Sequence, residues 1–94
     1  MEFDDSPVVA LNRAVAVANV HGPEAGLEAV RDIRDREKLD SYYLLYAVIG
    51  ELEMRLDNRE AAAEEFRKAL ELAGTAPERV FLSRRLESCA MENI

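Results

Sequence analysis

The sequence is poor in the residues on which catalysis and metal binding usually depend. Its single cysteine, Cys89, excludes an internal disulfide, and this favours a reducing, cytoplasmic location. Its single histidine, His21, has no other metal-ligating side chains around it at a suitable spacing. The sequence also shows no Ser–His–Asp order, no P-loop and no glycine-rich phosphate cradle. We therefore expect no catalytic residue, no metal and no cofactor, and we expect that the protein is not an enzyme.

Long apolar stretches and an excess of basic residues are also lacking. The longest apolar run, residues 42–50, is well short of the ~18 residues that a membrane-spanning helix needs, so we expect no membrane contact. The 94-residue chain carries 12 Lys and Arg against 19 Asp and Glu, which gives a net charge of −7. Binding to a phosphate backbone needs a basic face. We therefore expect no direct DNA binding by this chain, and a protein as its partner.

Hydrophobic residues make up 49% of the sequence, and they recur at helical spacing, with no strand signal. Pro7 and Pro23 suit first helical positions, and Gly22 suits the end of a helix. We expect Asp40 or Ser41 to cap the third helix. The sequence predicts an all-α domain whose five helices cover about residues 7–20, 23–35, 41–56, 59–73 and 77–91.

Small residues at particular positions indicate how the helices pair. Residues 46–73 hold one apolar helix, a short polar turn and a second, amphipathic helix. Gly50 in the first and Ala62 in the second allow two antiparallel backbones to approach, and Phe66 fills the space beside them. This is the pattern of a tetratricopeptide (TPR) unit, a helix–turn–helix repeat of ~34 residues. We expect one buried cluster made of Tyr46, Ile49, Gly50, Ala62, Phe66 and Ala69.

The first two predicted helices repeat the next two at an offset of 36 residues, the distance from His21 to Asp57. The match is moderate, because Ile33 aligns with the smaller Ala69. Small or apolar residues align at the other positions of close contact: Ala14 with Gly50, Gly26 with Ala62 and Val30 with Phe66.

The fifth helix departs from this repeat. Arg84 lies 34 residues after Gly50, and a long charged side chain does not suit a close contact between helices. We therefore expect a capping helix, as the end of a solenoid requires. The predicted domain is a single TPR-like unit, residues 1–94, with a leader (1–5), a first helical pair (6–35), a TPR unit (40–74) and a capping helix (76–92).

Several sequence blocks, taken in order along the chain, resemble one bacterial family. They read SPVVALNRAVAVA from residue 6, HGPEAGL from 21, YYLLYAVIGEL from 42, LDNREAAAEEFRKALELAG from 56 and APERVFLSRRL from 76. Together they resemble the C-terminal TPR-like extension of a bacterial RNA polymerase sigma factor of the extracytoplasmic-function class. The resemblance covers essentially the whole chain.

The resemblance implies a part in transcription initiation. Polymerase binding and promoter recognition in that family belong to two N-terminal sigma regions that this chain does not contain, so none of those residues carries over. What carries over is a non-catalytic regulatory or interaction role, with the protein's own sigma regions or the RNA polymerase core as partner. The alternatives are a free-standing TPR-like adaptor or dimerisation module and, more remotely, an enzyme subunit or small-molecule sensor.

The predicted interaction surface draws on the first helix, the tyrosine cluster and the last helix. Asn12 and Arg13 interrupt an otherwise apolar helix, and they either face a ligand or serve the structure. In the structural alternative Arg13 packs between helices and pairs with an acidic residue such as Glu24 or Glu51. The candidate residues are Val9, Asn12, Arg13, Val17, Tyr42, Tyr43, Arg79, Arg84 and Arg85.

Among the tyrosines, we expect Tyr46 in the core and the hydroxyl of Tyr42 or Tyr43 in water. The three arginines of the last helix suit contact with an acidic protein surface more than with nucleic acid. We expect Cys89 to act as a small buried hydrophobe rather than as a reactive thiol.

The first predicted helix carries apolar residues on more than one side, Val9 and Val17 among them. One neighbouring helix does not cover that much apolar surface, and solenoids need polar caps at both ends. We therefore expect the isolated chain to self-associate, for instance as a homodimer, through the open end that the first two helices form. In a longer protein the same face is the candidate for an interdomain contact.

Overall fold

The computed structural model describes residues 7–33 and 36–91, and within them it contains helices and no strand. The predicted all-α class is therefore confirmed. The 3-10 helix η1 is not among the predicted elements, and α2 ends earlier than predicted. The elements are α1 (Pro7–His21), α2 (Pro23–Arg31), η1 (Arg36–Leu39), α3 (Tyr43–Arg55), α4 (Arg59–Leu72) and α5 (Ala76–Met91).

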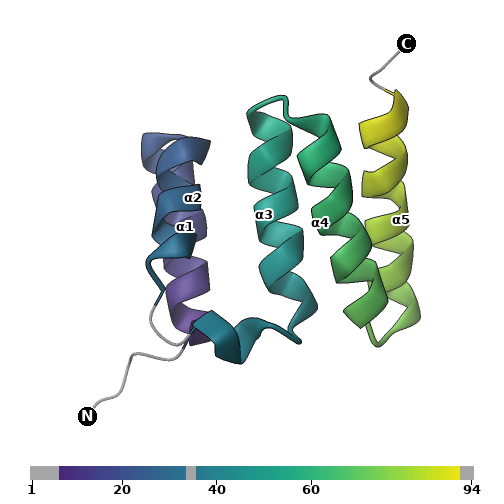
Figure 1. The fold of residues 1–94 in the computed structure, drawn as a ribbon, viewed down its shortest axis with the longest axis horizontal. Helices are drawn as coiled ribbons and strands as arrows, with labels where there is room; N and C mark the ends of the chain where they lie inside the picture. The colour runs from purple at the N-terminus through teal and green to yellow at the C-terminus, as the bar shows by residue number, and fades with distance from the viewer. Residues whose placement is uncertain (1–6, 34–35, 92–94) are drawn as a thin grey trace.

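Successive α-helices run antiparallel in an elongated molecule of 49 × 30 × 18 Å (Figure 1). The first helix pair is α1 and α2, and the second helix pair is α3 and α4. The helices within each pair pack extensively, and α5 packs against α4. Contact between α2 and α3 is less extensive, so the interface between the two pairs is smaller than the interface between the two helices of either pair.

The turns between helices follow from particular residues. Gly22 separates α1 from α2 with a φ of 101°, a left-handed conformation that favours glycine, and Pro23 then opens α2. Asp57, with a φ of 66°, occupies the turn between α3 and α4. Thr75 and Glu78 cap α5 reciprocally, because the Glu78 N–H donates to Thr75 Oγ1 at 3.4 Å and the Thr75 N–H donates to Glu78 Oε1 at 3.3 Å.

The predicted cap of α3 is wrong. Tyr42, with an extended backbone, holds the N-cap position, and no side chain caps the helix there. The Tyr42 N–H donates to the carbonyl of Leu39, the last residue of η1, at 2.9 Å, so the turn closes later than predicted. Asp40 and Ser41 therefore precede the helix start, and the Asp40 carbonyl accepts a bond from the Tyr46 hydroxyl at 3.0 Å. The predicted leader, residues 1–5, lies outside the described residues.

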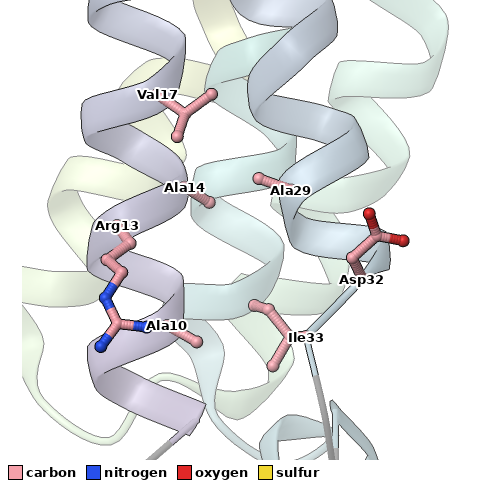
Figure 2. A pocket seen from close by; sticks show the side chains of 7 residues that line it. All are labelled: Ala10, Arg13, Ala14, Val17, Ala29, Asp32 and Ile33. Carbon is pink, nitrogen blue, oxygen red and sulfur yellow. The ribbon is translucent and has the colours of Figure 1, made fainter. Parts of the chain in front are cut away.

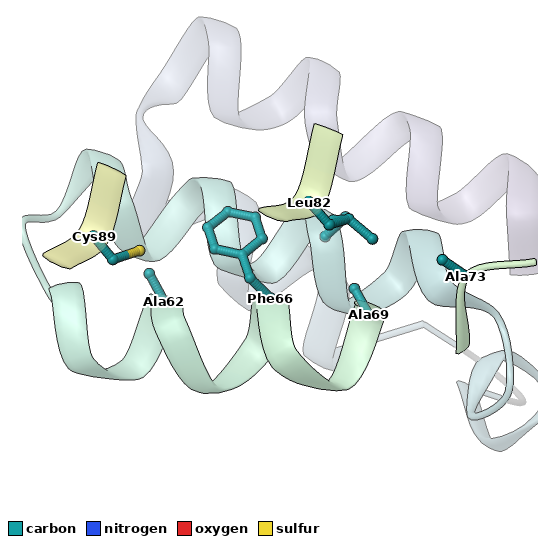
Figure 3. Packing of buried hydrophobic residues seen from close by; sticks show 7 residues of the cluster. Ala62, Phe66, Ala69, Ala73, Leu82 and Cys89 are labelled. Atoms are coloured by element: carbon teal, nitrogen blue, oxygen red, sulfur yellow. The ribbon is translucent and has the colours of Figure 1, made fainter. Parts of the chain in front are cut away.

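Two clusters of buried side chains form the core. The first cluster joins the second helix pair to α5 around the fully buried Phe66, and it contains Ala47, Ala62, Phe66, Ala69, Ala73, Leu82 and Cys89 (Figure 3). The second cluster belongs to the first helix pair, and it contains Leu11, Ala14, Val30, Ile33, Leu39 and Leu45. Leu39 comes from η1 and Leu45 from α3, so the first pair completes its core with side chains from later in the chain.

Glycine permits the closest contact within each helix pair. A Cβ atom at Gly50 would lie 2.8 Å from Cε1 of Phe66, and a Cβ at Gly26 would lie 2.5 Å from the Cβ of Ala18. Both distances are shorter than van der Waals contact, so a larger residue at either position requires neighbouring atoms to shift.

The predicted buried cluster is confirmed for Gly50, Ala62, Phe66 and Ala69. Tyr46 and Ile49 are only half-buried. Their side chains lie toward the first helix pair, where Tyr46 contacts both clusters and Ile49 contacts the cluster of the first pair. They mark the boundary between the pairs rather than the interior of one.

The 36-residue offset is also present in the burial pattern. Five buried positions of the first pair fall on buried positions of the second, namely Leu11 on Ala47, Ala14 on Gly50, Gly26 on Ala62, Val30 on Phe66 and Ile33 on Ala69. Arg55 Nη1 on α3 also donates to Asn19 Oδ1 on α1 at 3.2 Å, which links the two helix pairs.

Candidate interaction site

A groove of about 430 Å³ lies between α1 and α2, at the opposite end of the molecule from α5 (Figures 1 and 2). Its floor is made of small and aliphatic side chains, while Arg13 on α1 and Asp32, the C-cap residue of α2, lie on opposite sides of it. Among the described residues, neither charged side chain has a hydrogen-bond or ion-pair partner. The groove is lined by Ala10, Arg13, Ala14, Val17, Ala29, Asp32 and Ile33.

The predicted surface residues of α1 divide between the groove and its surroundings. Arg13 and Val17 line the groove. Val9 is 41% exposed and Asn12 is exposed, but neither lines it. The structural alternative for Arg13 does not hold, because its side chain is exposed and its suggested partner Glu51 binds a different arginine. Arg13 is therefore available to a ligand or partner.

Tyr42 and Tyr43 belong partly to the core. Their rings meet edge to face, with centroids 6.0 Å apart and an interplanar angle of 76°. Tyr42 packs against the cluster of the first helix pair, and Tyr43 packs against the cluster around Phe66. Burial, and next the negative charge of Glu78, raises the pKa of the Tyr43 hydroxyl above its ordinary value. The two tyrosines join the helix pairs and do not form a separate exposed patch.

The three candidate arginines of α5 have different surroundings. Arg85 is half-buried and binds both carboxylate oxygens of Glu51 on α3, at 2.6 and 2.9 Å. Arg79 donates from Nη1 to the Leu70 carbonyl in the last turn of α4 at 3.1 Å. The guanidinium of Arg84 is exposed and has no partner among the described residues. Of the predicted arginine cluster, Arg84 is thus the member without an internal bond.

The outer face of α5 carries an apolar patch that the sequence analysis missed. Val80 and Phe81 are 51% and 50% exposed. Neither residue is among the candidate residues of the predicted interaction surface. The signal was present in the sequence, because Phe81 lies beside the helical stripe of Leu82, Leu86 and Cys89 rather than on it.

The predicted role of Cys89 agrees with its surroundings. Its side chain is 3% exposed, and its Sγ lies 3.5 Å from the Sδ of Met54. Burial raises the pKa of the Cys89 thiol, which disfavours the reactive thiolate. Across the described part of the chain, no group of His, Cys, Asp or Glu has the arrangement of a metal site. No helix in that part has the length and apolar character needed to cross a membrane.

Comparison with known proteins places a related stretch in a bacterium. No family model matches this chain, and no solved structure matches it. The chain is 38% identical over 87 residues to an uncharacterized protein of Rhizobium meliloti (strain 1021). The match covers 93% of this chain and 20% of that protein, so the chain spans about a fifth of the length of the curated relative that it matches.

Proposed function

We propose that this chain is a non-catalytic, TPR-like interaction domain of a bacterial sigma factor. In this proposal it acts in transcription initiation through contacts with the protein's own sigma regions or with the RNA polymerase core. The observation that carries the interaction role is the groove between α1 and α2, with its apolar floor and its two charged side chains that have no partner in the described part of the chain.

The TPR-like arrangement is supported by close helix packing inside both pairs and by recurring burial. Gly50 of α3 lies against Phe66 in the second pair, and Gly26 of α2 lies against Ala18 in the first, so the glycine is on a different helix in each pair. Burial recurs at the 36-residue offset, as at Val30 and Phe66. In stacked repeats each unit covers the exposed face of the next, and binding surfaces form along the stack.

The groove corresponds to a face that is covered in the second helix pair. At the same offset its residues Ala10 and Arg13 fall on Tyr46 and Ile49, whose side chains pack against the first pair. Among the described residues, no element covers the equivalent face of the first pair. A helix of a sigma region or of the polymerase is the kind of element that this face would receive.

The sigma-factor assignment rests on the order of the sequence blocks that resemble the family. The relative in Rhizobium meliloti contains the related stretch within a polypeptide about five times as long as the match. A longer relative suits a domain that works while attached to others, although it does not name their activity.

The complete reading frame of the gene is the first test. We expect it to encode the two sigma regions upstream of this domain, and a frame that joins the domain to unrelated sequence would contradict the assignment. The second test measures binding of residues 1–94 to purified sigma regions and to purified core polymerase by surface plasmon resonance.

Two α1 variants give this binding test a matched control. Val17 lines the groove, whereas Val20 is 75% exposed and lies outside it. We expect Val17→Lys to abolish binding and Val20→Lys to leave it unchanged. Equal binding by the two variants, or no binding to either protein, would refute the proposed role of the groove.

A free-standing adaptor or dimerisation module is the second candidate. It is favoured by the exposed Val80 and Phe81 on α5, because an exposed aromatic residue beside an aliphatic one suits contact with another protein. A reading frame that encodes this domain alone would favour it.

A further inference from the structure

Two apolar features that no residue of the ranges 7–33 and 36–91 covers lie at opposite ends of the molecule. At one end is the groove between α1 and α2, and at the other is α5, whose Val80 and Phe81 are about half exposed (Figure 1). The first feature is a groove, and the second includes the exposed aromatic ring of Phe81. Their complementary shape makes a second copy of this chain a candidate occupant of the groove.

The groove exists because the first helix pair lacks a ring that the second pair has. Ala10 aligns with Tyr46 at the 36-residue offset. The ring of Tyr46 lies beside α4, with Lys68 Nζ 5.7 Å from its centroid. Val30 likewise takes the position of the larger Phe66. An aromatic side chain brought by another molecule would therefore fill a volume that Tyr46 occupies in the equivalent pair.

The charges at the groove also differ from those of the second pair. Arg13 stands where the second pair has Ile49, and Asp32 stands where it has Lys68. An occupant is thus expected to bring a carboxylate toward α1 and a cation toward α2.

One face of α5 carries this combination around its exposed ring. Glu78 lies one turn before Phe81 and Arg84 lies one turn after it, at spacings that place all three on the same side of a helix. The Arg84 guanidinium has no partner among the described residues. Glu78 uses Oε1 to cap the start of α5, through bonds from the N–H groups of Gly74 and Thr75, and no described residue binds its Oε2.

We infer that α5 of a second copy docks in the groove between α1 and α2, with Phe81 filling the space that Tyr46 fills in the second helix pair. Arg84 pairs with Asp32 across the interface, and Glu78 pairs with Arg13. This rests on the proposed function for the groove being a contact surface, and it concerns the free domain, in which no helix of a sigma region or of the polymerase occupies the groove. The interface is head to tail, so each added copy leaves one groove and one Phe81 open, and association continues with concentration.

Two substitutions block the two halves of this interface separately. Ala10→Phe fills the groove from within, and Phe81→Ser removes the ring. By sedimentation velocity we expect the average mass of the original chain to rise with concentration, and each variant alone to stay monomeric. An equimolar mixture of the two should form a dimer that grows no further, since Ala10→Phe retains Phe81 and Phe81→Ser retains the groove. Val20→Ser, at an exposed position outside the groove, is the matched control and should associate like the original chain.

Each other outcome overturns the inference. A monomeric original chain at millimolar concentration leaves no self-association to explain. Association of Phe81→Ser alone shows that the ring is not the occupant. Mixed variants that stay monomeric show that the contact is not head to tail. The reading-frame and polymerase-binding tests do not depend on these results, so failure here is distinguishable from failure of the proposed function.

A pair of charge reversals keeps the test valid if Ala10→Phe disturbs folding. Asp32→Lys and Arg84→Glu alter exposed positions, and circular dichroism should show both variants folded. Each alone should weaken association by about tenfold, since rim charges are brought against like charges. Both changes in one chain restore an opposite pair and should recover association. No recovery in the double variant contradicts the Arg84–Asp32 contact.

Discussion

Several buried positions of the first helix pair recur in the second pair 36 residues later, but the side chains at those positions differ in size. The second pair contains its own aromatic side chains, with Phe66 against Gly50 and Tyr46 at the edge, and α5 covers it on one side. The first pair has Val30 and Ala10 at the corresponding positions, and its core is completed by Leu39 and Leu45 from outside the pair. A helix pair with smaller side chains therefore depends on neighbouring elements to complete its core. Where no described element covers the pair, a groove remains.

The largest expected effect is a loss of unfolding free energy that differs between the two pairs, because their buried side chains differ in size. Phe66→Ala should lower the free energy of unfolding by about 3–5 kcal/mol, because it empties a fully buried aromatic site. Val30→Ala should cost only about 2 kcal/mol, since it removes two methyl groups. Phe81→Ala, at a half-exposed site, is the matched aromatic control and should cost least. Urea unfolding followed by circular dichroism measures all three, and equal losses for Phe66→Ala and Phe81→Ala would contradict the core assignment.

The close contacts at glycine give the next effect. Gly26→Ala and Gly50→Ala should each destabilise the domain by about 1–3 kcal/mol through overpacking, even though alanine favours helices by ~1 kcal/mol. We expect the larger loss at Gly26, because the obstructing atoms include the Cα of Ala18, whereas the Phe66 ring at Gly50 is a side chain that can shift. Gly74→Ala is the control, since no atom lies within 4 Å of the added Cβ. If thermal unfolding shows the same stability change for Gly26→Ala as for Gly74→Ala, the helices are not in close contact at Gly26.

A smaller effect concerns the link between α3 and α5. Arg85 binds Glu51 and lies 5.8 Å from the centroid of the Phe66 ring. The two charged side chains are 28% and 37% exposed, so solvent screens the pair and its contribution should not exceed ~1 kcal/mol. Arg85→Met should therefore cost up to that amount, whereas Arg84→Met should cost nothing measurable in a monomeric sample. A double-mutant cycle with Glu51→Gln measures the coupling energy of the Arg85–Glu51 pair. A coupling energy of zero would show that the pair does not stabilise the fold.

The smallest effect is a pH dependence from buried protons. The folded state raises the pKa of Cys89 above its ordinary value of 9.0, so the unfolded chain loses this proton first as pH rises. The stabilisation is thus complete below pH 9 and declines as pH increases through the raised pKa. Tyr43, whose pKa is raised above 10.0, contributes in the same direction at higher pH. Unfolding measured at several alkaline pH values should show a shallower decline for Cys89→Ala than for the original chain, and identical slopes would count against burial of the thiol.

The helices, their order and the main close contacts were predictable from the sequence. Apolar spacing and the boundary residues Pro7, Pro23 and Gly22 indicate where α-helices form, and the small Gly50 opposite Phe66 indicates where two of them meet. These signals come from residues close together in the sequence, so a single sequence is enough to recognise them. The alignment of Ala14 with Gly50 at the 36-residue offset likewise indicated a repeat from the sequence alone.

The features that the sequence did not predict depend on contacts between elements. Arg85 was expected to contact an acidic protein surface, but it binds Glu51 because its side chain reaches from α5 to α3, which helical periodicity does not specify. Tyr42 caps α3 because η1 shifts the turn, and the backbone rather than a side chain makes that turn. The groove itself arises from a side chain that is small, Ala10, where its counterpart Tyr46 is large. An absent volume of this kind becomes evident only once the neighbouring helices are placed.

We propose that the first helix pair is completed by another molecule that binds in the groove between α1 and α2. Hydrogen exchange measured by mass spectrometry on dilute, monomeric protein tests it most directly, because amide protection reports local opening. We predict that α1 and α2 exchange faster than α3 and α4, and that Ala10→Phe slows exchange in α1 and α2 while leaving α3 and α4 unchanged. Equal protection of the two pairs in the original chain, with no gain from Ala10→Phe, would contradict the account.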